Sequence, residues 1–262
     1  MKILVCIKQV PASNQVRVDE ETGVLIRDGV SAKMNPYDLF ALEFALQLKE
    51  RFSCEVDVLT MGPLQAKSVL NEAVYMGADR GVLLSDRKFA GADVIATSYT
   101  LAQGIKATGS YDLILCGKQT TDGDTGQVGP EMAEFLGVEH VSNVFEVLFV
   151  NEEKMLVKVN FEHHTYEQEI RYPCLLTIEK EANIPRLPSY KRKKQTTDDV
   201  ISVLSLEDFT DKDPSHYGLN GSETSVERIF SPEKNDDRIM LSGEPSEQVQ
   251  ALYALLKERH VF

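Results

Sequence analysis

The stretch from Gly117 to Gly129 has the residue types of a nucleotide-binding loop. It contains four glycines, which let backbone N–H groups come close to a ligand. Between the glycines lie neutral hydrogen-bonding side chains, namely Gln119, Thr120, Thr121, Thr125 and Gln127. If a helix begins just after this loop, its free N–H groups and positive dipole end favour a pyrophosphate. The loop therefore indicates an anion site.

Two aspartates in the same loop, Asp122 and Asp124, would repel a phosphate. They fit a nucleotide site only if they accept hydrogen bonds from ribose or ribityl hydroxyl groups. Two other interpretations stay open. The loop can be a polar turn that joins a strand to a helix. It can also belong to a Ca²⁺ loop, although the remaining oxygen ligands and the terminal Glu of that pattern are absent.

The better-known phosphate motifs are missing. The loop does not contain the G-x-G-x-x-G pattern of dinucleotide-binding folds, and residues 62–68 lack the second glycine of a P-loop. The sequence therefore supports neither an ordinary dinucleotide fingerprint nor an ATPase.

Other reactive side chains give weaker signals. His163 and His164 are adjacent, so in a strand they point to opposite faces, and no acidic or Cys partner lies at metal-ligand spacing. As a nucleophile, Cys6 or Cys116 would need a base, which residue order alone does not identify. The four cysteines form no C-x-x-C pair, so we expect buried reduced thiols and neither a zinc site nor a secreted disulfide framework.

The bulk composition limits the classes of partner and compartment. With 262 residues, of which 42% are hydrophobic, the chain can bury one sizeable core and carry an appendage. A net charge of -13 disfavours nucleic acid or an anionic membrane as the partner of the whole surface. No run approaches the roughly 18 apolar residues of a membrane span, and residues 1–5 enter an apolar strand without a cleavage site. We expect a cytoplasmic protein without membrane insertion.

Strand-like and helix-like segments alternate over the first two-thirds of the chain, which predicts a doubly wound, mostly parallel α/β sheet. Strands are expected at residues 3–7, 56–59, 81–84, 111–116 and 175–178, and helices at 36–51, 69–76, 92–107 and from about 130. Asn35 offers an N-cap oxygen and Pro36 fits the first helical position. Residues 16–26, with a turn at 21–23, predict a hairpin inserted after the first strand.

In such a sheet, ligands bind beyond the carboxyl ends of the strands. Three segments should meet at that edge, namely residues 6–11, 60–63 and 117–129. Residues 35–38, at the start of the first long helix, are a fourth candidate.

The later part of the chain changes in character. Residues 142–172 form three β-branched or alternating runs, which predict a small antiparallel extension. The region after residue 195 has too few apolar residues for a core of its own, although a final helix is expected from 246 to about 259. We therefore expect a nucleotide-binding α/β domain over 1–195 and an extended C-terminal arm over 196–262, which packs on something else.

Four blocks of sequence resemble the beta subunit of electron-transferring flavoproteins, in that family's order and spacing. They are residues 5–11 (VCIKQVP), 34–38 (MNPYD), 76–81 (MGADRG) and 116–130 (CGKQ…DGDT…QVGP). The resemblance covers about residues 1–195, and the last block is highly specific. It implies an adenine-nucleotide site and an obligate alpha subunit that carries its own FAD.

The resemblance also implies which residues line the nucleotide site. They are Cys6, Asn35, Pro36, Tyr37, Asp38, Met61, Gly117, Gln119, Thr120, Asp122, Gly123, Asp124, Thr125, Gly126, Gln127 and Val128. In mitochondrial-type members this site holds AMP, and in the bifurcating group it holds a second FAD. The form of residues 122–130 resembles the bifurcating group. The resemblance therefore implies FAD reduced by NADH, with AMP as the alternative.

Basic residues cluster near the end of the predicted domain, namely Arg186, Lys191, Arg192, Lys193 and Lys194. A solvated loop is one interpretation, and nucleic-acid binding is disfavoured by the acidic remainder of the chain. By position, residues 183–195 are similar to the family's recognition loop, which docks a partner dehydrogenase of the acyl-CoA or another type, although they do not match the mitochondrial-type loop closely. The implied docking residues are Leu187, Tyr190, Lys191, Arg192 and Lys193, with Leu187 and Tyr190 as apolar anchors.

Three functions compete at this point. In the first, the chain is a subunit of an electron carrier, in which the flavin does the redox chemistry and the protein binds and tunes it. The second is a stand-alone ATP- or AMP-binding regulatory protein, and the third is a hydrolase of an adenylated substrate. The long arm with a terminal amphipathic helix suits binding to a partner chain better than a monomeric sensor. We therefore expect the first function.

Overall fold

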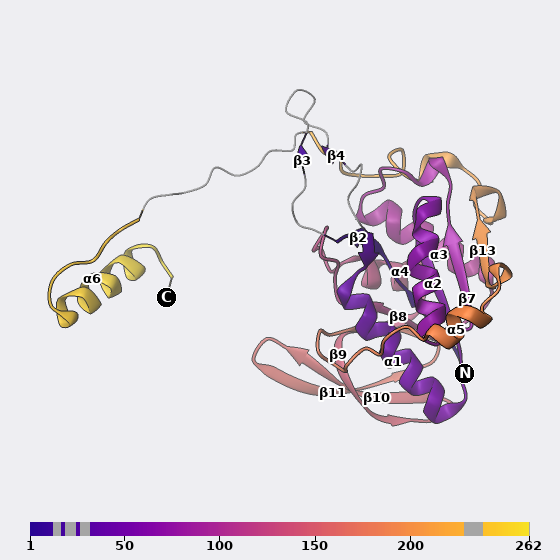
Figure 1. The fold of residues 1–262 in the computed structure, drawn as a ribbon, viewed down its shortest axis with the longest axis horizontal. Helices are drawn as coiled ribbons and strands as arrows, with labels where there is room; N and C mark the ends of the chain where they lie inside the picture. The colour runs from indigo at the N-terminus through magenta and orange to yellow at the C-terminus, as the bar shows by residue number, and fades with distance from the viewer. Residues whose placement is uncertain (13–16, 19–24, 27–31, 228–237, 262) are drawn as a thin grey trace.

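The computed structural model describes residues 1–12, 17–18, 25–26, 32–227 and 238–261, and places most of them around one large sheet (Figure 1). The strands of this sheet are β1 (Lys2–Cys6), β6 (Glu55–Met61), β7 (Arg80–Leu84), β8 (Leu113–Gly117), β9 (Glu139–Val150), β10 (Lys154–Phe161), β11 (His164–Arg171), β12 (Cys174–Ile178) and β13 (Ile201–Leu204). Their order is β11-β10-β9-β12-β8-β1-β6-β7-β13. Strands β12 to β13 in this order are parallel. The parallel strands β12, β8, β1, β6 and β7 were predicted, whereas β13 was not.

Helices cover both faces of the sheet. They are α1 (Pro36–Phe52), α2 (Lys67–Met76), α3 (Val94–Thr108) and α4 (Val128–Leu136), followed later by α5 (Tyr190–Gln195) and α6 (Pro245–Glu258). The apolar sides of α1 and α2 pack with one face of the strands, whereas those of α3 and α4 pack with the other. The doubly wound α/β fold is therefore confirmed.

Local signals explain where these helices begin and end. Pro36 is the first residue of α1, where its missing N–H costs no hydrogen bond. Asp93 caps α3 by accepting a hydrogen bond from the Ala96 N–H at 3.0 Å. Gly77 ends α2 with a φ of 147°, a conformation that glycine adopts without strain.

The predicted antiparallel extension is also present. Strands β9, β10 and β11 form an antiparallel ribbon at one side of the sheet, and β9 joins the parallel part through β12. The inward side chains of β10, such as Met155 and Val157, are fully buried against the core that α1 covers. This alternation of buried and outward residues is what the sequence pattern of the segment indicates.

Small antiparallel pairs follow β1. Strands β3 (Arg17–Val18) and β4 (Leu25–Ile26) pair as the predicted hairpin, whose turn at 21–23 lies outside the described residues. Strands β2 (Gln9–Pro11) and β5 (Ala32–Met34) pair as well and lead into α1.

The chain returns to the main sheet after residue 195, where the sequence predicts that the arm begins. Strand β13 pairs in parallel with β7. The side chains of Leu206, Phe209 and Tyr217 are buried in the core that α3 and α4 cover, and the Phe209 ring stacks on Phe89 with centroids 5.4 Å apart. Helix α6 contains no buried residue and is drawn apart from the sheet in Figure 1. None of the described helices has the length and apolar character needed to cross a membrane.

Candidate functional site

The chain changes its winding direction between β1 and β8. From β1 it proceeds through α1, β6, α2 and β7 on one side, and then α3 leads back to β8 on the other side of β1. The helices that follow β1 and β8, namely α1 and α4, lie on opposite faces of the sheet, so these two strands form its switch point. Open α/β sheets bind ligands at such a position.

The predicted segments meet at this edge. Cys6 pairs with Leu59 on β6 and with Cys116 on β8, so that the three strands end side by side. The convergence of residues 6–11, 60–63 and 117–129 that the sequence predicts is therefore confirmed.

A buried carboxylate, Asp38, joins three parts of the edge. Its Oδ2 accepts a hydrogen bond from the Lys8 N–H at 2.7 Å, and its Oδ1 accepts from the Gly117 N–H at 3.2 Å and from Asn35 Nδ2 at 2.9 Å. Burial raises the pKa of Asp38 to about 7, although these hydrogen bonds and the nearby Lys8 charge act in the opposite direction. Asp38 thus holds the ends of β1 and β8 to the start of α1.

The first glycine of the loop is required by this arrangement. A Cβ atom on Gly117 would lie 2.5 Å from Asp38 Oδ1 and 2.6 Å from the Tyr37 carbonyl carbon. Both distances are far below van der Waals contact, so only glycine fits here.

Asn35 has a different role from the predicted one. It precedes α1, but its side chain makes no cap hydrogen bond to the helix, so the predicted N-cap oxygen is wrong. Instead, its Nδ2 donates to the Gln119 carbonyl oxygen at 2.9 Å, and its Oδ1 accepts from the Thr121 N–H at 3.2 Å. The loop presents to this side chain backbone groups that have no other partner among the described residues. Hydrogen bonds to these groups replace the hydrogen bond that Asn35 would make as a helix cap.

An ion pair that the sequence interpretation missed closes one side of the edge. Lys8 Nζ lies 2.8 Å from Asp122. Burial acts to raise the pKa of Asp122, but the hydrogen bond and charge of Lys8 outweigh it, and the net shift is downward. This pairing removes much of the repulsion that Asp122 would exert on a phosphate. The sequence signal that could have revealed this ion pair was Lys8, a cation two residues beyond the end of β1.

The rest of the loop is open to solvent and ends at a helix N-terminus. Within the described chain, no acceptor contacts the backbone N–H groups of Thr125, Gly126 and Gln127, just before α4. Asp124 has a φ of 55° and accepts a short hydrogen bond from the Gln119 side chain, and Gly126 has a φ of 68°. The loop thus presents free N–H donors and exposed hydroxyl groups, as a phosphate site requires.

The remaining glycines of the loop differ in role. A Cβ on Gly129 would lie 2.8 Å from Cys116 Sγ, so this glycine allows α4 to pack closely on β8. A Cβ on Gly123 would meet only Thr120 Oγ1, at 3.4 Å, so the space around Gly123 is open. Only Gly123 and Gly126 therefore have surroundings that leave room for a ligand.

The predicted apolar residues form the floor and rim of the edge. Cys6 is buried, and Met61 and Val128 pack against the same core as α3 and α4. Burial and the neighbouring Asp38 charge raise the pKa of Cys6 to about 12, and burial also raises the pKa of Cys116. Both thiols stay protonated, which argues against either as a nucleophile. Pro36 and Tyr37 are half-buried at the start of α1.

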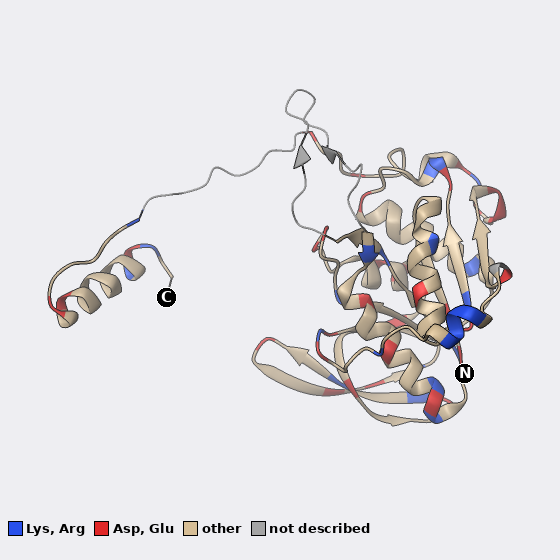
Figure 2. Ribbon diagram, in the orientation of Figure 1, with Lys and Arg blue, Asp and Glu red and all other residues tan. Residues whose placement is uncertain are grey.

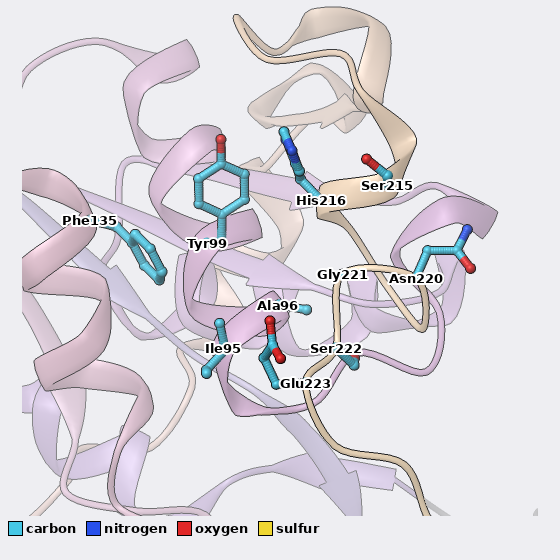
Figure 3. A pocket seen from close by; sticks show the side chains of 10 residues that line it. All are labelled: Ile95, Ala96, Tyr99, Phe135, Ser215, His216, Asn220, Gly221, Ser222 and Glu223. Atoms are coloured by element: carbon cyan, nitrogen blue, oxygen red, sulfur yellow. The ribbon is translucent and has the colours of Figure 1, made fainter.

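A separate hollow of about 340 Å³ contains none of the predicted site residues (Figure 3). It is lined by side chains of α3, the end of α4 and residues 215–223. His216 Nδ1 lies 2.6 Å from Asp211, but Ser215 Oγ donates to Asp213 and makes no described hydrogen bond to His216. These residues therefore do not form a nucleophilic triad. No group of three His, Cys, Asp or Glu side chains in the described ranges is arranged to hold a metal ion.

The predicted docking residues lie away from this edge, on a segment that crosses α1 and α2. Leu187 and Tyr190 are exposed, and residues 190–195 form the short, strongly basic helix α5 (Figure 2). Arg192 is not a free cation, because its guanidinium donates to the Val74 and Ala78 carbonyl oxygens at 3.1 and 3.2 Å. Lys193 Nζ lies over the Tyr75 ring at 5.9 Å, whereas no ion pair of Lys191 is found among the described residues.

Comparisons with known proteins agree on one family. The family model for the electron transfer flavoprotein domain matches residues 22–205. The chain is 42% identical over 260 residues to the electron transfer flavoprotein subunit beta of Clostridium acetobutylicum, which covers 99% of each chain. It is 44% identical over 263 residues to the caffeyl-CoA reductase-Etf complex subunit CarD of Acetobacterium woodii, covering 100% of each. It is also 43% identical over 258 residues to the protein FixA of Bradyrhizobium diazoefficiens, covering 96% of this chain and 90% of the relative.

Proposed function

The chain belongs to the electron transfer flavoprotein family as a beta subunit, and we propose that it binds FAD at the carboxyl edge of its sheet. In this proposal it forms a heterodimer with an alpha subunit that carries a second FAD. The heterodimer takes electrons from NADH and bifurcates them, sending one branch to a partner dehydrogenase or reductase.

The observation that carries this proposal is the carboxyl edge at β1 and β8, where the N–H groups just before α4 have no acceptor in the described chain and Asp122 is paired with Lys8. Thr125, Gly126 and Gln127 would hold the phosphates by their N–H groups. Asp124 and Thr121 would bond hydroxyl groups of the ribose or ribityl chain. Cys6, Met61 and Val128 supply an apolar floor.

A bound flavin supplies the redox chemistry, because it can exchange one or two electrons. The described side chains position it and do no chemistry of their own. Asp38 and Asn35 fix the loops at the carboxyl edge, and Lys8 balances the charge of Asp122.

The relatives support the wider assembly. One relative is named as a subunit of a caffeyl-CoA reductase-Etf complex, which joins such a chain to a reductase. By analogy, we propose that residues 183–195 dock a dehydrogenase or reductase, through Leu187, Tyr190, Lys191 and Lys193. Arg192 would contribute by holding the segment in place.

Cofactor extraction from purified heterodimer tests the central claim. Two FAD per heterodimer, one of them bleached rapidly by NADH, are expected. One FAD and one AMP would instead make this subunit a structural nucleotide binder in a non-bifurcating carrier, because AMP would make the same phosphate contacts.

Expression of the chain without the alpha subunit tests the assembly. We expect a poorly soluble or flavin-depleted protein, since none of the apolar residues of α6 is buried in the described part of this chain. A well-behaved yellow monomer in sedimentation would contradict the heterodimer. A colourless monomer that binds ATP or AMP would support the alternative of a stand-alone regulatory protein.

A further inference from the structure

Three apolar side chains stand out from the segment that crosses α1 and α2. Ile184, Leu187 and Tyr190 have 89%, 87% and 70% of their surface exposed. They lie within seven positions of one another in the sequence, and Tyr190 is the first residue of the basic helix α5. Large exposed apolar residues gathered in this way are typical of an interaction surface. Ile184 has no place in the docking set that the sequence predicts.

An ion pair between the partly exposed Arg186 and the buried Glu43 fixes the first half of this segment. The Arg186 guanidinium donates through Nε and Nη2 to both carboxylate oxygens of Glu43, at 2.8 and 3.0 Å, and the Arg186 N–H donates to Glu43 as well, at 3.1 Å. The Glu43 side chain is only 5% exposed. Such a forked contact sets the orientation of both groups. Arg186 Nη1 also donates to Glu50 at 2.5 Å, at the solvent-exposed end.

Other contacts fix the segment on both sides of this pair. Asn183 Nδ2 donates to the Phe40 carbonyl oxygen of α1 at 2.9 Å. The Ser189 N–H donates to the Tyr75 carbonyl oxygen of α2 at 2.9 Å, and Arg192 binds two further carbonyls at the end of α2. The exposed apolar side chains are therefore carried by backbone that is held on two helices.

Helix α1 connects this segment with the proposed nucleotide site. Asp38, in its first turn, binds the ends of β1 and β8. Glu43 lies about one and a half turns further along the same helix. A helix packed against a sheet along its length is a rigid connection, so the position of Arg186 is set relative to the carboxyl edge.

We propose that Glu43 is a positioning residue for partner docking, which acts through Arg186 to hold Ile184 and Leu187 in one place relative to the nucleotide site. This inference rests on the proposed function. A surface that is ordered before binding loses less conformational entropy when the partner arrives. Electron transfer adds a second reason, because its rate falls steeply with the distance between donor and acceptor.

The test uses the full heterodimer and a variant that leaves no unpaired buried charge. In Glu43→Gln with Arg186→Gln, two neutral amides of similar size replace the ion pair, so the fold is expected to persist. Glu50→Gln is the matched control, since it removes only the exposed arm of the same cluster. Hydrogen exchange of residues 184–190 and the rate of trypsin cleavage after residues 191–194 report the order of the segment.

Electron transfer then separates positioning from stability. The rate is measured against the concentration of an acyl-CoA dehydrogenase, and separately with a small redox dye that does not dock. We expect exchange and cleavage in the double variant to be at least tenfold faster, with an increase of about tenfold in KM for the dehydrogenase. The dye rate, the flavin content and the values for Glu50→Gln should stay unchanged.

Unchanged exchange and cleavage in the double variant would overturn the proposal, because Glu43 would not then order the segment. Faster exchange with an unchanged KM would also overturn it, provided that Leu187→Ala raises KM in the same assay. If Leu187→Ala leaves KM unchanged, the docking surface itself fails, and both the positioning role and that part of the proposed function are rejected.

Discussion

The two edges of the parallel sheet hold buried carboxylates in different ways. At the amino edge, the Asp57 side chain is 2% exposed. Its two carboxylate oxygens accept hydrogen bonds from Arg80 Nε and Nη2, at 3.0 and 2.7 Å. The Tyr111 hydroxyl donates to it at 3.1 Å, and Lys2 Nζ lies 3.8 Å away. At the carboxyl edge, Asp38 is also buried but receives only amide N–H groups, and no cation forms an ion pair with it in the described chain.

We interpret this difference as a division of roles within one sheet: the amino edge stabilises the fold, and the carboxyl edge is available for a ligand. At the amino edge, Asp57 has hydrogen-bond and ion-pair partners from the chain itself. The carboxyl edge keeps a carboxylate with a raised pKa and leaves the N–H groups before α4 without an acceptor. Unsatisfied groups of this kind lower stability and are typical of ligand sites.

The strongest test of the carboxyl edge is Gly117→Ala. Its new methyl group would overlap Asp38 and the Tyr37 backbone, so we expect the free energy of unfolding to fall by about 3 kcal/mol, together with loss of the nucleotide. Urea unfolding and flavin absorbance measure both effects. Gly123→Ala is the control, since its methyl group meets only Thr120 at an ordinary distance. Equal stability of the two variants would show that the packing around Asp38 is looser than described.

The corresponding test of the amino edge is Arg80→Gln. Removing one partner of a buried pair typically costs about 3–5 kcal/mol, and we expect about 2 kcal/mol here because the Arg80 side chain is half exposed and Lys2 remains. Flavin content per folded heterodimer should not change, since the proposed nucleotide site lies at the opposite edge. Lys154→Gln, which breaks an exposed pair with Glu169, should have no measurable effect on urea unfolding. Loss of flavin in Arg80→Gln alone would contradict the separation of the two edges.

The Asp38 carboxyl predicts a pH dependence. Its pKa in the folded chain, about 7, is above the unfolded value, so the folded state binds the proton more tightly. Its contribution to stability is full below about pH 4 and is lost as the pH rises through 7. We therefore expect the stability of the native chain, relative to Asp38→Asn, to fall by about 2 kcal/mol between pH 5 and pH 8.

Urea unfolding of both proteins across this range measures that difference, because all other titrating groups cancel. A relative stability that rises with pH would show that hydrogen bonds outweigh burial and hold the carboxylate ionised. Asp57→Asn provides a comparison from the neutralised edge.

The smallest effect on stability is expected for Gly123→Val. The space around Gly123 is open, so the unfolding midpoint should be unchanged, whereas the branched side chain should displace a nucleotide that lies against this backbone. Absorbance of the flavin per heterodimer provides the measurement. Full flavin content in this variant would remove Gly123 from the proposed site.

The charges beside the docking residues should have a smaller effect than the substitutions above. Lys191→Glu with Lys193→Glu reverses two exposed charges near Leu187, and such rim charges act mainly on association rate. We expect slower transfer to the dehydrogenase at low salt, a smaller dependence on salt and an unchanged flavin content. Turnover that stays the same at every salt concentration would exclude a role for these lysines.

Short-range patterns in the sequence determined the elements of the fold. Helix α1 follows from Pro36 and an apolar face, β1 from a buried apolar run, and the antiparallel extension from alternating residues between 142 and 172. The same reasoning located the glycine-rich loop before α4, because glycines and hydroxyl side chains close together in the sequence indicate a phosphate site. Parallel pairing then placed the ends of β1, β6 and β8 at one edge.

The tertiary structure alone decided which groups satisfy one another. Asn35 and Gln119 are 84 positions apart, Lys8 and Asp122 are 114 apart, and Arg186 and Glu43 are 143 apart. The return of residues 201–204 to the sheet beside β7 is a contact of the same kind. Periodicity and capping rules describe neighbours within a few residues, whereas these partners depend on which polar groups the folded chain brings together. That is why the sequence could predict the loop but not the contacts that hold it.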